Sequence, residues 1–197
     1  EKIYVANLAK VNEELQQLYD IEGSDKMQIL KMLTRLRQLC LEPRLVYDNI
    51  DQPSSKLKAC MELIKTMQEN KQKVLLFSSF TSALDLIAEE CQKAGITYYM
   101  LTGSTNKEER RELVSRFQKD DTTVFLISLK AGGTGLNLTS AENVIHYDPW
   151  WNVSAQNQAT DRAYRIGQKS NVQVFNLVMK DSVEEKIIEM QKRKKEL

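Results

Sequence analysis

Apolar side chains recur three and four positions apart in the first third of the chain, and they form short uninterrupted runs in the remainder. The first pattern predicts amphipathic helices over 27–40 and 54–67, separated by a connector that begins at residue 42. The second pattern predicts strands that are buried on both faces. We expect strands at 74–77, 98–101, 123–128, 143–147 and 172–178, and further helices at 81–95, 106–118, 155–166 and from Ser182 to the basic run 192–195.

Polar residues at the predicted helix boundaries fit capping positions. Asn106 with Glu109, and Ser182 with Glu185, have the spacing of an N-terminal capping pair. Gly95 follows a helical pattern at the position where a left-handed residue commonly ends a helix. Local signals therefore support the boundaries of these helices.

Strands and helices alternate over short connections, which predicts an α/β fold with a parallel sheet covered by helices on both faces. We divide the chain into a helical extension over 1–53, an α/β lobe over 54–180 and a C-terminal helix over 181–197. In a parallel sheet, functional residues gather at the carboxyl ends of the strands. Four polar loops follow the first four strands, at 78–82, 102–106, 129–139 and 148–152.

Composition narrows the class of protein. With 197 residues and 42% hydrophobic content, the chain can bury a substantial core. It has no apolar run of the ~20 residues that span a bilayer and no signal-peptide pattern, so we expect no membrane association. Its first residue is Glu1, which suggests a piece of a longer polypeptide. A net charge of +1 permits a nucleic-acid partner without requiring one.

The cysteines and the histidine argue against several kinds of site. Cys40, Cys60 and Cys91 are odd in number, far apart and set in apolar helical patterns. We expect buried thiols in a reducing compartment rather than a disulfide framework or a metal site. The single histidine, His146, argues against a histidine-based metal or proton-transfer site.

A glycine-rich loop follows the third predicted strand. Three of the seven glycines lie within 132–135, and Lys130 and Thr134 add donors. A bare backbone with exposed N–H groups suits contact with phosphate, although glycine also serves ordinary tight turns. No Gly-Lys-Ser/Thr follows, so this segment is not a Walker A loop.

The predicted helix at 155–166 carries Gln158, Arg162 and Arg165 within an arc of about 60°, since successive residues turn by about 100°. A solvated face with an Asp161–Arg165 pair at i,i+4 is the structural alternative, but it leaves Arg162 unpaired. Arginine keeps its charge and offers a planar fork that matches phosphate oxygens. This helix is therefore predicted to reach toward a nucleotide held by another domain.

The order of these motifs carries a family resemblance. The segments 74–80, 98–118, 125–152 and 158–168 resemble the second RecA-like lobe, or helicase C-terminal domain, of Swi/Snf-type DNA translocases in helicase superfamily two. The resemblance covers nearly the whole chain, and its last motif is far more specific than a glycine loop. It implies a RecA-like α/β lobe with an N-terminal helical extension and a C-terminal brace helix. The compact motif spacing is more typical of bacterial members than of chromatin remodellers.

In this family two RecA-like lobes clamp ATP and move along double-stranded DNA, so the resemblance implies a DNA-dependent ATPase. Arg162 and Arg165 would act as finger residues, and Gln158 would face the nucleotide beside them. Gly135 and Asp161 would lie in motifs that support the nucleotide. The residues implied to contact the DNA backbone or to relay its state are Ser79, Thr102, Gly103, Lys130 and Thr134.

The resemblance also implies partners that this chain lacks. ATP and its Mg²⁺ would be held mainly by an N-terminal RecA-like lobe of the same polypeptide, so no metal ligand is assigned here and the isolated chain is expected to be inactive. Double-stranded DNA is the main expected partner, and RNA polymerase or other DNA-bound proteins are candidates. The protein would be cytoplasmic and nucleoid-associated in a bacterium, or nuclear in a eukaryote.

Three positions depart from the family pattern, and two other functions stay open. Relatives often read Pro-Ala and then Glu where this chain has Val153, Ser154 and Gln156, which concerns the start of the helix. The chain could instead be a non-catalytic RecA-like module that binds DNA or protein. A self-sufficient Rossmann-type transferase would need an acidic residue or a glycine fingerprint after the first strand, and residues 77–82 contain neither.

Overall fold

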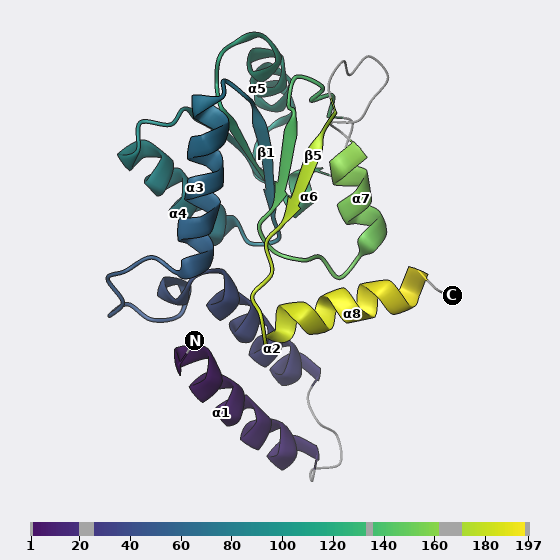
Figure 1. Cartoon of the computed structure of the whole chain (residues 1–197). Helices are drawn as coiled ribbons and strands as arrows, with labels where there is room; N and C mark the ends of the chain where they lie inside the picture. Colours follow the sequence, from purple (N-terminus) through teal and green to yellow (C-terminus); the bar gives the residue numbers. More distant parts are fainter. Residues whose placement is uncertain (1, 20–25, 133–135, 162–170, 196–197) are drawn as a thin grey trace.

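The computed structural model describes residues 2–19, 26–132, 136–161 and 171–195. Within these ranges, a five-stranded parallel sheet lies between layers of helices (Figure 1). The strands are β1 (Val74–Ser78), β2 (Tyr98–Leu101), β3 (Val124–Ser128), β4 (Asn143–His146) and β5 (Gln173–Asn176). The helices are α1 (Lys2–Tyr19), α2 (Lys26–Leu41), α3 (Ser55–Glu69), α4 (Thr81–Lys93), α5 (Lys107–Lys119), α6 (Leu129–Gly132), α7 (Val153–Asp161) and α8 (Val183–Lys195), with a 3₁₀ turn, η1, at Pro43–Leu45.

Strand order places β1 at the centre of the sheet. The order is β2-β3-β1-β4-β5, and each neighbouring pair is parallel. The connection from β3 to β4 crosses over β1, so the direction of winding changes at β1. In open parallel sheets this switch point is where ligand sites usually form, at the carboxyl ends of the strands. None of the described helices is long and apolar enough to cross a membrane.

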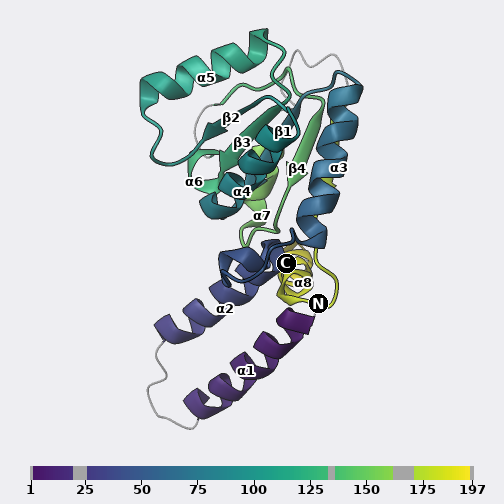
Figure 2. The same cartoon turned by 90° about the vertical axis from the view of Figure 1, so that its left-hand side faces the viewer.

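The two faces of the sheet bury separate cores because successive strand residues point to opposite sides. Leu76, Leu126 and Ile145 pack with α3 and α4 on one face. Phe77 and Phe125 pack with α5, α6 and α7 on the other face. Figure 2 shows α3 and α5 on opposite sides of the sheet, as the α/β prediction requires. Continuous apolar runs are therefore explained by burial on both faces.

A third core joins the helical extension to the C-terminal helix. Tyr4 on α1, and Leu36 and Cys40 on α2, pack against Met179 and Val183 near the start of α8. Figures 1 and 2 both show α1 and α2 beyond the carboxyl ends of the strands, where α8 also lies. The extension is thus packed on the lobe rather than separate from it.

A buried ion pair links α3 to α8 beneath this core. Lys56 Nζ lies 2.7 Å from Glu184 Oε1 and donates a second hydrogen bond to the carbonyl of Tyr147 at 2.7 Å. Glu184 also accepts the N–H of Met179 at 2.8 Å. Burial raises the pKa of Glu184, and the adjacent Lys56 opposes that shift. Both charges have partners, which is the condition for burying them.

Helix boundaries follow the predicted caps closely, with one change. Asn106 Oδ1 accepts the N–H of Glu109 at 2.9 Å, and Gly95 has a φ of +68°. At α8 the capping pair is displaced by one residue: Ser182 Oγ accepts the N–H of Glu184 at 3.1 Å, while Glu185 binds the N–H of Asp181 at 2.8 Å. The Glu184 carboxylate takes no part in this capping pair and faces Lys56.

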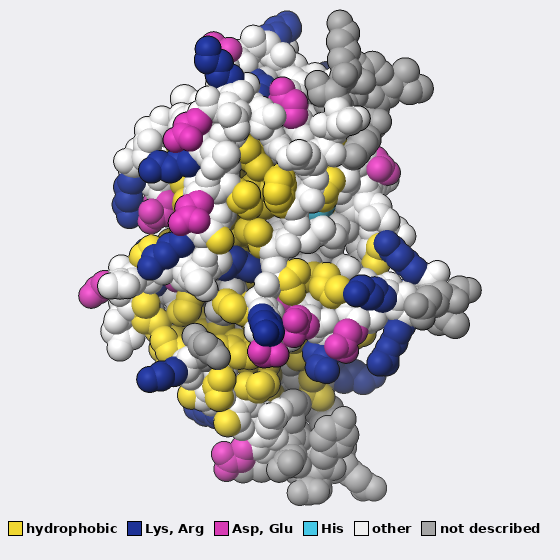
Figure 3. Space-filling view, in the orientation of Figure 1, with side chains coloured by type: hydrophobic (Ala, Val, Ile, Leu, Met, Phe, Trp, Pro, Cys, Tyr) yellow, Lys and Arg dark blue, Asp and Glu magenta, His cyan; other side chains and the backbone are white. Residues whose placement is uncertain are grey.

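Other expectations are also answered by the described residues. All three cysteines are buried and free of disulfides, as predicted, and burial raises the pKa of Cys40 and of Cys91 to about 12. The strand predicted at 172–178 ends at Asn176, because β5 pairs only along the four residues of β4. The side chains of Lys192 to Lys195 are exposed at the end of α8, where basic groups gather in Figure 3.

We expect Glu184→Ala to lower the unfolding free energy of the chain by about 3 to 5 kcal/mol, because Lys56 would be left buried without its partner. Urea denaturation followed by circular dichroism measures this loss. Glu189→Ala is the matched control, since Glu189 forms an exposed pair with Lys186 at 3.6 Å on the same helix. The control should lose at most about 1 kcal/mol. Equal losses in both variants would contradict the role assigned to Lys56.

Candidate functional site

Asp148 is the centre of the polar structure at the switch point of the sheet. It follows β4 and is only 1% exposed. Its Oδ1 accepts the hydroxyl of Ser78 at 2.6 Å and the N–H of Ser79 at 3.1 Å, both at the end of β1. Its Oδ2 accepts a hydrogen bond from Arg37 of α2 at 3.3 Å. One carboxylate therefore connects two strand ends and the helical extension.

Arg37 is held between two aromatic rings as it reaches Asp148. Its guanidinium carbon lies 4.9 Å from the ring centre of Phe80 and 5.5 Å from that of Trp151. Cations over aromatic faces are attracted by the ring quadrupole, and a planar guanidinium suits this stacking. Trp150 is 2% exposed and fills the core, whereas Trp151 is 39% exposed. Both tryptophans lie just before the start of α7.

The loop after β1 is closed by these contacts. The N–H of Ser79 donates to Asp148, and the N–H of Phe80 donates to Ser78 Oγ at 3.1 Å. Phosphate-binding loops at this position present unpaired backbone N–H groups to an anion. Here those groups are occupied and a carboxylate lies beside them. The loop after β1 is therefore not built to hold a triphosphate, which argues against the self-sufficient transferase.

Thr102, Gly103 and Lys130 are brought together at the ends of β2 and β3. The N–H of Thr102 donates to Thr105 Oγ1 at 3.0 Å, which shapes the loop before α5. A Cβ placed on Gly103 would lie 3.5 Å from Cβ of Lys130, in ordinary contact. The Lys130 side chain is exposed. Three of the predicted DNA-contact residues thus share one surface.

Ser79 lies at the next strand end but faces inward. Its N–H is bound to Asp148, and its hydroxyl oxygen is buried with no hydrogen-bond partner among the described residues. In this conformation a phosphate has no direct access to that hydroxyl. Contact between Ser79 and DNA stays a prediction.

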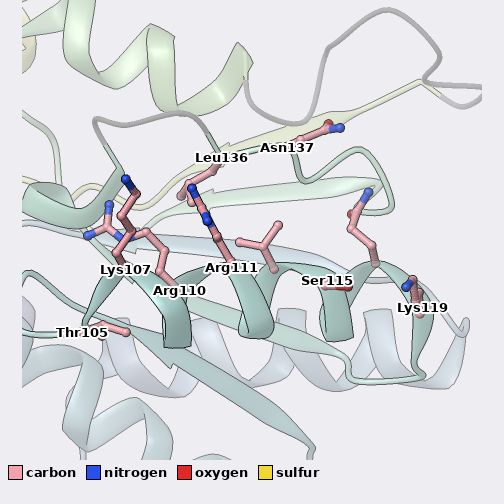
Figure 4. Close-up of a pocket in the computed structure, with 10 residues that line it drawn as sticks. Thr105, Lys107, Arg110, Arg111, Ser115, Lys119, Leu136 and Asn137 are labelled. Atoms are coloured by element: carbon pink, nitrogen blue, oxygen red, sulfur yellow. The ribbon is translucent and has the colours of Figure 1, made fainter.

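A groove with cationic side chains runs along α5 beside the same loops. It has a volume of about 850 Å³, and Val114 and Leu136 form part of its apolar lining. Figure 4 shows Arg111 and Lys119 extending from α5 toward the segment that holds Leu136. The described lining residues include no carboxylate, and its cationic residues are Lys107, Arg110, Arg111 and Lys119. Arg110 also donates to the carbonyl of Ala131 at 3.4 Å, so the groove adjoins α6.

Helix α7 leaves the Asp148 loop and returns alongside the sheet (Figure 1). Asn152 caps it by accepting the N–H of Ala155 at 3.3 Å, and Ala159 is buried against the core. Near its last turn, Thr160 Oγ1 lies 2.9 Å from Nε2 of His146 on β4. The histidine ring stacks on Phe77 at 5.6 Å. Burial lowers the pKa of His146 to about 4, so the ring is neutral at pH 7.

The remaining predicted site residues divide into those that the structure describes and those outside the described residues. Gln158 and Asp161 are exposed on α7. The remaining four predicted site residues, Gly135, Thr134, Arg162 and Arg165, lie outside the described residues. Arg162 follows the last residue of α7 directly in sequence.

Sequence reasoning did not assign roles to Asp148, Arg37 or His146. An aspartate directly after an apolar strand was a usable signal, because such positions fall at the carboxyl edge. Arg37 gave no local signal, since 111 positions separate it from Asp148. His146 carried weight in the sequence only as a single histidine that argues against a histidine-based metal or proton-transfer site, whereas in the structure it contacts Thr160 on α7.

The strand order, the closed loop after β1 and the polar loops at the carboxyl edge define a RecA-like lobe. Residues 55–167 match the helicase conserved C-terminal domain family. The chain belongs to this family, and its relatives place it as the C-terminal lobe of Swi/Snf-type ATP-dependent helicases.

Particular relatives give the extent of this similarity. The chain is 38% identical over its whole length to an ATP-dependent helicase of Mycoplasma pneumoniae, of which it covers 19%. It is 41% identical over 87% of its length to the putative ATP-dependent helicase/translocase YwqA of Bacillus subtilis, and covers 19% of that protein. The SWI2/SNF2 ATPase core of Sulfolobus solfataricus in complex with double-stranded DNA matches the whole chain with a TM-score of 0.84 and 32% identity, over 42% of that structure. The chain thus spans about a fifth of the length of the curated relatives.

We expect the chain to lose stability as the pH falls from 6.5 toward 4, because the unfolded state then binds a proton at His146 that the folded state rejects. The contribution at pH 5 is about 2 kcal/mol. Urea denaturation at pH 7 and pH 5 measures it. Between pH 7 and pH 5, His146→Gln should lose less unfolding free energy than the wild type, by about 2 kcal/mol. Identical pH dependence in the two proteins would contradict the assignment.

Proposed function

We propose that this chain is the second motor lobe of a two-lobe, ATP-dependent translocase that moves along double-stranded DNA. The observation that carries the proposal is the whole-chain match to a SWI2/SNF2 ATPase core in complex with DNA. In the full protein, Arg162 and Arg165 reach the triphosphate while the polar loops of this lobe contact the DNA backbone. The isolated chain is then a partial site without turnover of its own.

The division of labour between lobes is supported by what this lobe contains. Its sequence has no Walker A loop, and its loop after β1 is closed by Asp148. The described residues include no group of three or more His, Cys, Asp or Glu that could hold a metal ion. The other lobe would therefore hold ATP and Mg²⁺, and this lobe would contribute cationic groups from across the cleft.

The two arginines supply what the triphosphate needs during transfer. Charge develops on the oxygens of the transferring phosphoryl group, and guanidinium forks placed there stabilise it. Gln158 is exposed on α7, four residues before Arg162, and can donate an amide N–H to the nucleotide from the same helix. Closure of the lobes on ATP is favoured by these contacts, and loss of the γ-phosphate removes that preference.

DNA contact is assigned to the surface formed by Thr102, Gly103 and Lys130. The cationic groove along α5 adjoins this surface and extends it with Arg111 and Lys119. Phosphate contacts carry no base information, so binding would tolerate any sequence and weaken with salt. If each lobe grips the backbone in turn, one cycle of closure and opening moves the protein one step along the duplex.

We expect Arg165→Lys in the full-length two-lobe protein to lower DNA-stimulated kcat by at least about 100-fold, since a finger arginine is worth about 10³ to 10⁵ in rate and lysine keeps only the charge. A phosphate-release assay with saturating duplex measures kcat. Arg116→Lys, at an exposed arginine paired with Glu112 on α5, is the control and should turn over like the wild type.

The isolated 197-residue chain should release no phosphate above background in the same assay. Robust ATP hydrolysis by this chain alone would contradict the proposed division of labour between the lobes. Unchanged turnover in the Arg165→Lys protein would instead favour a non-catalytic binding module.

We expect Lys130→Gln and Arg111→Gln each to weaken binding of the full-length protein to duplexes of unrelated sequence by a similar factor. Each should also reduce the slope of log K against log salt by about 1, because one phosphate contact is removed. Fluorescence anisotropy over a series of salt concentrations measures both quantities. Lys65→Gln, exposed on α3 across the sheet from the groove, carries the same charge change and should leave the slope unaltered. A slope equal to the wild type in Lys130→Gln would exclude it as a phosphate contact.

A further inference from the structure

Three side-chain amides meet where α7 begins. Gln156 lies in the first turns of α7, Gln191 lies on α8, and Asn176 ends β5. We call this group the amide clasp. It joins three elements around the backbone of Trp150, which is itself in neither helix nor strand.

The side chains of the amide clasp are hydrogen-bonded to one another and to the backbone of Trp150. Gln156 Oε1 accepts the N–H of Trp150 at 3.2 Å and Nε2 of Gln191 at 3.2 Å. Gln191 Nε2 also donates to the carbonyl of Trp150. Gln156 Nε2 donates to Asn176 Oδ1 at 3.2 Å. Both polar backbone groups of Trp150 are thus bound by the two glutamines.

The orientation of each glutamine amide follows from this pattern. A backbone N–H can only donate, so Gln156 must turn its oxygen toward Trp150. The same oxygen and the Trp150 carbonyl then both face Gln191, which must present its NH₂ group to them. Gln191 is 9% exposed, so water has little access to replace these bonds. The clasp therefore needs a donor at position 191 and an acceptor at position 156.

Helix α8 carries the clasp at one end and a rigid junction at the other. Near its start, Glu184 pairs with Lys56, and the N–H of Val183 donates to the hydroxyl of Tyr4 at 2.7 Å. Its 13 residues span about 20 Å. The helical extension is therefore connected through α8 to the beginning of α7.

The far end of α7 has its own anchor in the Thr160–His146 contact. Between this anchor and the clasp, Ala159 and Ala155 pack against the core but make no polar contact through their side chains. The direction of α7 is thus set by polar contacts at its two ends. Because Arg162 follows α7 directly, a change at the clasp alters the direction in which the candidate fingers extend.

We propose that the amide clasp is a positioning device through which α8 sets the angle of α7 and so places Arg162 and Arg165 against the nucleotide. This inference rests on the finger role given above. Gln156 and Gln191 touch no substrate in this arrangement, and they act only through α7. Movement of the helical extension relative to the sheet would reach the fingers along α8.

The clasp predicts opposite outcomes for two substitutions of equal size and charge. Gln191→Glu replaces a donor by an acceptor that faces the Trp150 carbonyl and Gln156 Oε1, so the clasp opens. Gln156→Glu keeps the acceptor for Trp150 and Gln191, and Asn176 can rotate its amide to donate to the new carboxylate. Gln191→Met removes the same donors without burying a carboxylate, and it distinguishes loss of the donor from the cost of a buried charge.

The test uses DNA-stimulated ATPase of the full-length protein, with kcat and KM for ATP measured separately. We expect Gln191→Glu to lower kcat by about 10- to 100-fold with KM little changed, because small misplacements of a group acting on the transition state cost rates of that order. The kcat of Gln156→Glu should stay within about twofold of the wild-type value, because a twofold change in rate corresponds to far less free energy than the loss of one contact. Gln28→Glu, exposed on α2, is the charge-matched control.

Combining the Gln191 substitution with one at Arg165 distinguishes a positioning role of Gln191 from a general loss of structure. In an Arg165→Ala background, Gln191→Glu should cause no further loss of kcat, because the group that it misplaces is already absent. Gln191→Met removes the donors without adding charge and repeats the test if the glutamate variant fails to fold. Wild-type kcat in Arg165→Ala would overturn the finger role itself. If Arg165→Ala lowers kcat, then an unchanged Gln191→Glu, or an equal loss in both backgrounds, overturns the clasp alone.

Discussion

The buried carboxylate of Asp148 is the constraint on which the arrangement of this lobe depends. It lies where the winding of the sheet reverses, and it binds Ser78, Ser79 and Arg37 together. Without it, the loop after β1 would present backbone N–H groups, as a phosphate-binding loop does. With it, that loop is closed, the helical extension is fixed to the sheet, and α7 begins from a defined point. This closed loop is consistent with the proposal that the lobe completes a nucleotide site held by another lobe.

The lobe combines a stiff centre with a helix held mainly at its ends. The strands are buried on both faces, whereas α7 is fixed by hydrogen bonds to Trp150 at one end and His146 at the other. Hydrogen bonds between neutral groups contribute modest net stability, so such contacts can rearrange at a cost that nucleotide binding can offset. A close-packed core is nearly incompressible and resists local rearrangement. Helix α7, which has few polar anchors, is therefore the element of the lobe best suited to move.

The sequence was informative where a local pattern is sufficient. Continuous apolar runs located the strands because both faces are buried, and the cap of α5 could be identified because capping is a contact between near neighbours. Pairing between distant residues was not accessible: Arg37 and Asp148 are 111 positions apart, and Gln156 and Gln191 are 35 apart. The resemblance to helicase lobes supplied the candidate site residues, and their roles stay predictions. The contacts of Arg162 and Arg165 stay a prediction, since both lie outside the described residues.

The buried cysteines have a practical consequence for following this lobe at work. Cys40, Cys60 and Cys91 are fully enclosed, and burial raises the pKa of each thiol, so the folded chain offers maleimide dyes no reactive thiolate. A single cysteine introduced on an exposed position of α5 or α8 would then be the only labelling site in this chain. Paired with a dye on the proposed second lobe, it would report the proposed opening and closing in single molecules without removal of any native cysteine of this chain.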